Sequence, residues 1–171
     1  MKPSVKYGLI LGGVLAAFPL LVYALGMDKE ESFQKISTII NLALISTILY
    51  LGIKEERDQH GNGFISFGKG FGTGIRISSI AALISMVFSY LYFTVINPGM
   101  VTYIKMKQEE ELMNRGMSEE MIEKASANMD KWMSPEAMAG FSMFGTLLLG
   151  LVITLIVAAL MKKEDPSAEI S

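Results

Sequence analysis

Four long stretches without a charged residue constrain the fold of this chain more than any other feature. They cover residues 7–25, 36–53, 77–96 and 141–161, and each is predominantly apolar. A helix rises about 1.5 Å per residue, so about 20 apolar residues cross the hydrocarbon core of a bilayer. Helices of a soluble bundle carry Lys or Glu on their outer face, and none of these stretches does. The sequence therefore predicts four transmembrane helices.

The composition narrows the functional classes. Of the 171 residues, 51% are hydrophobic and only 19% are charged, and the charged residues lie mostly between the apolar stretches. The formal charge of −2 offers no basic surface for nucleic acid. The chain has no cysteine, which excludes disulfides, thiolate catalysis and cysteine-bound metal centres.

We expect one all-α membrane domain over residues 1–171, an integral membrane four-helix bundle. Its predicted spans are residues 7–25, 36–53, 74–96 and 136–161. A signal peptide is the alternative for the first span, but this apolar run is longer than usual and contains Pro19, so we expect it to be retained. The short polar tail after Lys163 is expected to be disordered.

The connections between the spans differ in character. Residues 26–35 form a short polar turn, which predicts an antiparallel hairpin of the first two spans. Residues 54–74 open with a charged run, turn at residues 60–63 and continue with many Gly and Phe residues. We expect this last part to approach the membrane at its interface, with three aromatic rings at the headgroup boundary. These are Phe64, Phe67 and Phe71.

Residues 97–134 are predicted to form a two-helix extramembrane insertion between spans three and four. Asn97 and Pro98 are typical of a helix start, and Gly116 is typical of a helix end. Ser118 then begins the second helix, because acidic residues follow it directly. Ser134 and the proline after it repeat the start signal for the fourth span.

The second helix of this insertion has one apolar face. Its members are Met117, Met121, Ala125 and Met129, and we expect them to face protein or lipid. The charged residues between them are expected to face water; they are Glu119, Glu120, Glu123 and Lys124. Thioethers at this spacing can bind Cu(I), but packing is the favoured interpretation because Met fills irregular gaps. Trp132 is expected at the headgroup level.

Residues that could carry chemistry are few. The four charge-free stretches contain no Asp, Glu, Lys or His, which argues against an ion-coupled transporter. Arg76, at the start of the third span, is expected to snorkel to the interface; a buried ligand contact is the alternative. His60 is the single histidine and is expected to be exposed in a turn. No catalytic motif occurs, so we predict no enzyme and no catalytic, cofactor-binding or metal-binding residues.

Small residues predict where helices approach closely. They are Gly8 and Gly12 in the first span and Ala81, Ser85 and Ser89 in the third. Packing within the bundle is the simpler interpretation, and an interface with a second copy or another membrane protein is the alternative. Basic residues divide almost equally between the two sides, but the segments on the N-terminal side are shorter and therefore denser in charge. This favours both termini inside the cell.

Three motifs together resemble a known family. They are residues 64–67 with their Gly-rich surroundings, the pair Asn97 and Pro98, and residues 116–120. Together with the four spans, these motifs resemble the bacterial membrane family catalogued as domain of unknown function 4199, from Lys6 to Lys163. The resemblance implies a four-span bacterial membrane protein without an assigned activity, and it provides no catalytic residues to transfer.

We therefore expect a non-enzymatic accessory or interaction protein of the bacterial inner membrane. The alternative is a small channel or carrier subunit that acts as an oligomer. The expected partners are the lipid bilayer and either a second copy of the chain or another membrane protein, with no nucleic acid and no cofactor.

Overall fold

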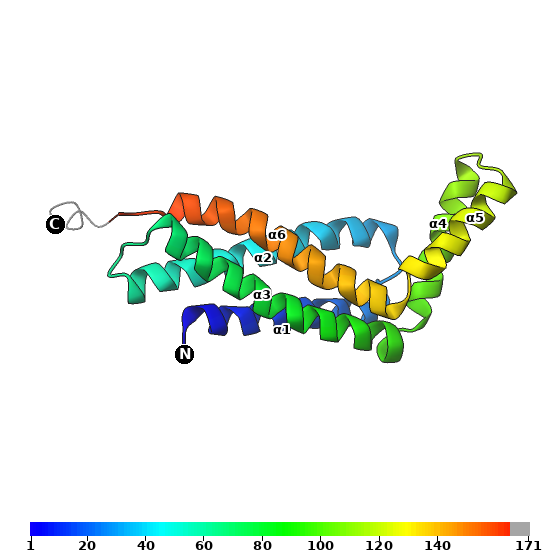
Figure 1. The fold of residues 1–171 in the computed structure, drawn as a ribbon. Helices are drawn as coiled ribbons and strands as arrows, with labels where there is room; N and C mark the ends of the chain where they lie inside the picture. Colours follow the sequence, from blue (N-terminus) through cyan, green and yellow to red (C-terminus); the bar gives the residue numbers. More distant parts are fainter. Residues whose placement is uncertain (165–171) are drawn as a thin grey trace. The chain divides into compact units, whose positions relative to one another are not determined.

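The computed structural model describes residues 1–164, which form six α-helices and one π-helical segment (Figure 1). These elements are α1 (Pro3–Ala24), α2 (Glu31–His60), α3 (Phe67–Leu91), the π-helix η1 (Tyr92–Ile96), α4 (Gly99–Asn114), α5 (Glu119–Trp132) and α6 (Pro135–Met161). Within residues 1–164 there is no strand, only an isolated antiparallel bridge between Ile65 and Lys163. The all-α prediction is confirmed.

Four of the helices are long and apolar enough to cross a membrane: α1, α2, α3 with its continuation η1, and α6. This confirms the four apolar helices that the charge-free stretches predict. The predicted break at Gly116 is also confirmed, since α4 ends at Asn114 and α5 begins at Glu119. The expected disorder after Lys163 falls almost entirely on residues 165–171, outside the described residues.

The helices α1 and α2 begin four and five residues earlier than predicted, at Pro3 and Glu31, and two further boundaries differ more. The helix α2 continues through the charged run to His60, because Lys, Glu and Arg are good helix formers and nothing there ends the helix. It stops where Asn62 and Gly63 adopt positive φ angles of 50° and 86°. The helix α3 begins at Phe67 rather than residue 74, with the Ser66 hydroxyl accepting a hydrogen bond from the Lys69 N–H at 3.3 Å. Arg76 therefore lies inside α3, not at its start.

The chain forms two compact units. The first comprises Met1–Ser85 and Phe144–Ser171, and the second comprises Met86–Met143. In the first unit, parts of α1, α2, α3 and α6 lie side by side (Figure 1). Its apolar core draws on all four helices, with Leu11, Leu49, Ile53 and Ile77 completely buried and Val157 nearly so.

Glycines of α1 and α2 bring these helices close to α3. A Cβ atom at Gly8 would lie 2.7 Å from Ile80 Cβ, and one at Gly12 would lie 2.6 Å from Ile84 Cδ1. Gly52 of α2 receives the Ile77 side chain in the same way. Real Cβ atoms do not approach so closely, so each glycine is the space in which an isoleucine of α3 packs. The close-approach prediction for Gly8 and Gly12 is confirmed.

Each of the helices α3 and α6 has a glycine that faces a hydroxyl-bearing side chain of the other helix. Gly74 of α3 faces Thr154 of α6, and Gly150 of α6 faces Ser78 of α3. Ala81 and Ser85 of α3 are buried as predicted, although the Ser85 hydroxyl has no hydrogen-bond partner in the described part of the chain. Small residues therefore occur on both sides of this contact, whereas the sequence pattern identified only one side.

The second unit contains the helical hairpin of α4 and α5. Gly116, with a φ of 74°, donates to the Met113 carbonyl, and Met117 donates to the Leu112 carbonyl, which closes the end of α4. Pro98, rather than Asn97 as predicted, takes the N-cap position of α4. The Asn97 side chain is buried and donates to the Tyr92 hydroxyl at 3.1 Å.

The predicted faces of α5 are largely present. Met117, Ala125 and Met129 are half-buried, and the four charged residues expected in water are exposed. Met121, by contrast, is 53% exposed, so the chain itself does not cover it. The inward face includes Ile122 and Ser126 instead, because positions three and four apart share a helical face and a strict spacing of four drifts around it.

We predict that Gly150→Ala destabilises the protein although alanine is the better helix former. The added methyl group would overlap the Ser78 side chain, and overpacking typically costs about 1–3 kcal/mol. Gly145→Ala is the matched control in the same helix, because a Cβ there meets nothing within 4 Å. Thermal unfolding in detergent should show a lower midpoint for the first variant and an equal or higher one for the second. Equal midpoints for both variants would contradict the close contact.

Candidate functional site

One end of the first unit brings the ends of several helices together. Ile65, in the connection between α2 and α3, donates to the Lys163 carbonyl at 2.9 Å, and the Lys163 N–H donates back to the Ile65 carbonyl at 3.0 Å. The Lys163 ammonium also lies 5.3 Å from the centroid of the Phe64 ring. These contacts tie the α2–α3 connection to the residues that follow α6, so polar side chains of several helices gather at this end.

A carboxylate joins α1 to α2 at this end. Glu55 accepts hydrogen bonds from the Lys6 ammonium at 2.7 Å and from the Tyr7 hydroxyl at 2.9 Å. Its side chain is only 14% exposed. Hydrogen bonds to an ionised group are about twice as strong as neutral ones, and two donors on one partly covered carboxylate fix the position of both helices.

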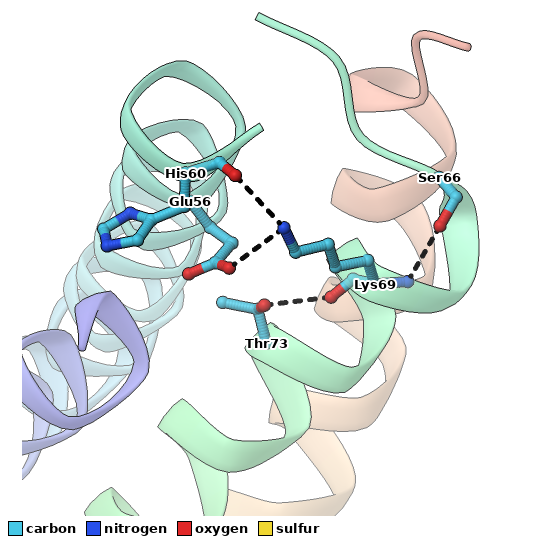
Figure 2. Close-up of polar contacts among 5 residues, drawn as sticks. All are labelled: Glu56, His60, Ser66, Lys69 and Thr73. Carbon is cyan, nitrogen blue, oxygen red and sulfur yellow. Dashed lines mark hydrogen bonds and ion pairs between the residues drawn. The ribbon is translucent and has the colours of Figure 1, made fainter. Parts of the chain in front are cut away.

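A second ion pair joins α2 to α3 (Figure 2). The Lys69 ammonium lies 3.5 Å from the Glu56 carboxylate and 3.5 Å from the His60 carbonyl oxygen. The Thr73 hydroxyl donates to the Lys69 carbonyl at 2.9 Å, which holds the first turns of α3. His60 is exposed as predicted, and Figure 2 shows its imidazole ring pointing away from Lys69.

The charged side chains at this end of the first unit mainly form ion pairs that join one helix to another. Glu55 and Glu56 each meet a lysine of another helix, and Arg57 pairs with the neighbouring Asp58 at 2.7 Å. Outside the spans, a hydrogen bond from Lys162 lowers the pKa of the Glu164 carboxyl below its ordinary value. Within residues 1–164, no three His, Asp or Glu side chains are grouped so that they could hold a metal ion.

A different kind of surface lies on the α4–α5 hairpin. The two helices are joined by an ion pair between Lys105 and Asp130 at 2.7 Å and by a hydrogen bond from the Ser126 hydroxyl to Glu109. No residue of either helix is buried. The large apolar side chains that stay exposed there include three methionines, with exposed fractions of 56%, 59% and 53%; they are Met106, Met113 and Met121. We call these three side chains the methionine surface.

Trp132 at the end of α5 is 64% exposed, and its ring centroid lies 6.3 Å from that of Phe141. The aromatic pair adds to the apolar area that this unit exposes. The position of Trp132 at the headgroup level stays a prediction.

The fold and these two surfaces define the class of the protein. Four helices long and apolar enough to cross a bilayer, with charged residues gathered at helix ends and in the hairpin, indicate a membrane protein. The chain belongs to the family described as "Protein of unknown function (DUF4199)", whose model matches residues 6–163. This confirms the resemblance found in the sequence. Comparison with curated proteins and with solved structures gives no match.

We predict that Glu55→Gln lowers the unfolding temperature in detergent more than Glu56→Gln does. Glu55 accepts from two donors at 2.7 Å and 2.9 Å, whereas Glu56 lies 3.5 Å from its lysine. The two substitutions remove the same charge at adjacent positions, so each controls for the other. An equal or larger loss for Glu56→Gln would show that the Lys6–Glu55–Tyr7 contact does not hold α1 in place.

Proposed function

We propose that the protein is a non-enzymatic accessory protein of the bacterial inner membrane that recognises a partner through the α4–α5 hairpin. In this proposal α1, α2, α3 with η1, and α6 span the bilayer, and residues 97–134 lie outside it. The hairpin sequence supports this placement, because α4 from Lys105 onward and α5 carry many charged residues, whereas the middles of the four apolar helices carry almost none.

The methionine surface is the observation that carries the proposal. Exposed apolar side chains among charged residues are a common feature of interaction surfaces, and methionine adapts its shape to a partner without a large energetic cost. Met106 and Met113 are seven residues apart, so they lie on the same face of α4. Met121 near the start of α5 adds a third apolar side chain beyond the Gly116 turn.

The distribution of hydroxyl groups favours an accessory role over a pore formed by several copies. Such a pore needs polar side chains on the outer surface of the bundle, facing the shared axis. On α3 and α6, Ser78, Ser85 and Thr154 are instead buried inside the first unit. Of the threonines in α2, α3 and α6, only Thr38 and Thr47 of α2 are exposed. The outer faces of the same helices expose large apolar residues, among them Leu83 and Leu155.

We predict that replacing Met106, Met113 and Met121 together by Gln abolishes co-purification of a specific membrane partner and leaves the spans folded. Glutamine keeps the side-chain length and the helix propensity but removes the apolar surface. The matched control replaces three exposed charged residues of the same hairpin, Lys107, Glu110 and Glu123, by Gln. Partners are quantified after mild solubilisation of native membranes, and thermal unfolding reports on the spans.

Two results would contradict the proposal. The first is an unchanged set of partners for the methionine variant, and the second is an equal loss of partners in the control variant. Replacing residues 100–133 by a short linker gives an independent check. If the bundle then collapses, the hairpin is a structural part of the fold rather than a recognition element.

A further inference from the structure

The part of the α4–α5 hairpin around its turn carries an excess of negative charge. Residues 106–124 contain six glutamates and three basic residues. Each basic residue forms an ion pair with a nearby glutamate; the pairs are Lys107–Glu110, Arg115–Glu111 and Lys124–Glu120. The other three glutamates have no ion pair with any residue among positions 1–164; they are Glu109, Glu119 and Glu123. Lys105, one turn before Glu109, pairs with Asp130 at 2.7 Å instead.

Helical spacing places these three carboxylates beside two of the exposed methionines. Residues three, four and seven apart share one face of a helix. One face of α4 is formed in this way by Met106, Glu109 and Met113. One face of α5 is formed in the same way by Glu119, Glu123 and Ser126. The Ser126 hydroxyl donates to the Glu109 carboxylate, so the two faces adjoin. We call these six residues the Met–Glu stripe.

The extent of the Met–Glu stripe indicates what kind of ligand fits. Its carboxylates do not suit a single metal ion, because no three acidic side chains within residues 1–164 are grouped for that. Glu119 and Ser126 are seven residues apart, which is about 10 Å along α5. The negative charges therefore follow about two helical turns, and the more than half-exposed side chains of Met106 and Met113 lie beside them. A ligand for this face needs several spaced positive charges next to apolar groups.

We propose that the Met–Glu stripe binds a cationic amphipathic helix of the membrane partner. This inference rests on the proposed function, since it specifies which part of the partner meets the methionine surface. The apolar side chains of such a helix cover Met106 and Met113, whose thioethers adapt to the shape of the partner. Its basic side chains reach the three unpaired carboxylates. These exposed charges select a cationic partner and speed its association, while the apolar contact provides most of the affinity.

The test measures binding of synthetic amphipathic helices to the full chain in phosphatidylcholine nanodiscs, with empty nanodiscs as the blank. The peptides share leucines at helical spacing and carry Lys, Gln or Glu at the polar positions. Fluorescence anisotropy should show that the Lys peptide binds about tenfold more tightly than the Gln peptide and that the Glu peptide does not bind. Added salt should weaken binding of the Lys peptide, because exposed charges are screened. Equal affinities for the Lys and Gln peptides would overturn the proposal.

Two variants with the same net charge locate the site. The acid variant replaces the unpaired glutamates by Gln: Glu109, Glu119 and Glu123. It should bind the Lys peptide about tenfold more weakly, with about a twofold loss for Glu123→Gln alone. The control variant replaces the paired glutamates by Gln: Glu110, Glu111 and Glu120. It should keep most of the affinity, and equal losses in the two variants would overturn the proposal.

A smaller variant guards against a loosened hairpin, because Glu109 also accepts the Ser126 hydrogen bond. Glu119→Gln combined with Glu123→Gln keeps that bond and should still weaken binding of the Lys peptide about fivefold. An unchanged affinity in this folded variant would contradict the proposal.

Co-purification from native membranes separates this inference from the proposed function. Both stand if the methionine variant and the acid variant each lose the partner. If the methionine variant loses the partner and the acid variant retains it, the proposed function stands and the cationic helix is wrong. If both variants retain the partner, both proposals fail.

Discussion

The close approach of α3 to its three neighbours holds the first unit together. Inside a bilayer the hydrophobic effect does not draw helices to one another, so association depends on van der Waals contact between closely spaced backbones. Glycines of α1, α2 and α6 supply this spacing: Ile80 packs on Gly8, Ile77 on Gly52, and Ser78 on Gly150. Thr154 packs on Gly74 in return, so α3 both inserts side chains and receives one.

This packing also sets the position of the polar groups at the end of the unit. The contact of Gly52 with Ile77 and Tyr7 brings the following turn of α2, with Glu55, next to Lys6. The ion pairs therefore follow from the apolar contacts rather than causing them. A change at a single glycine would displace the charged layer as well as the core.

The four apolar helices can be predicted from the sequence because a long stretch without charged residues is a local property. It can be recognised without knowing which helix packs against it. The helix ends are harder to predict: residues 54–58 are charged, yet α2 continues through them because they are good helix formers, and only Glu55 and Glu56 pair with lysines of α1 and α3. The partner of a glycine depends on how the helices cross, so Gly150 and Gly52 could not be identified from a stripe on one helix. Asparagine is a common helix cap, but here Pro98 holds the N-cap position and the Asn97 side chain donates to the Tyr92 hydroxyl.

In the proposed topology the membrane is crossed four times, so residues 54–74 face the cytoplasm and residues 97–134 face the other side. The chain has no cysteine, so single cysteines can be introduced without background. Labelling with a membrane-impermeant maleimide compares Asn62→Cys in the connection with Gln108→Cys in α4. We expect that Gln108→Cys reacts in intact cells and that Asn62→Cys reacts only after the membrane is opened. Labelling of both positions from the same side would contradict it.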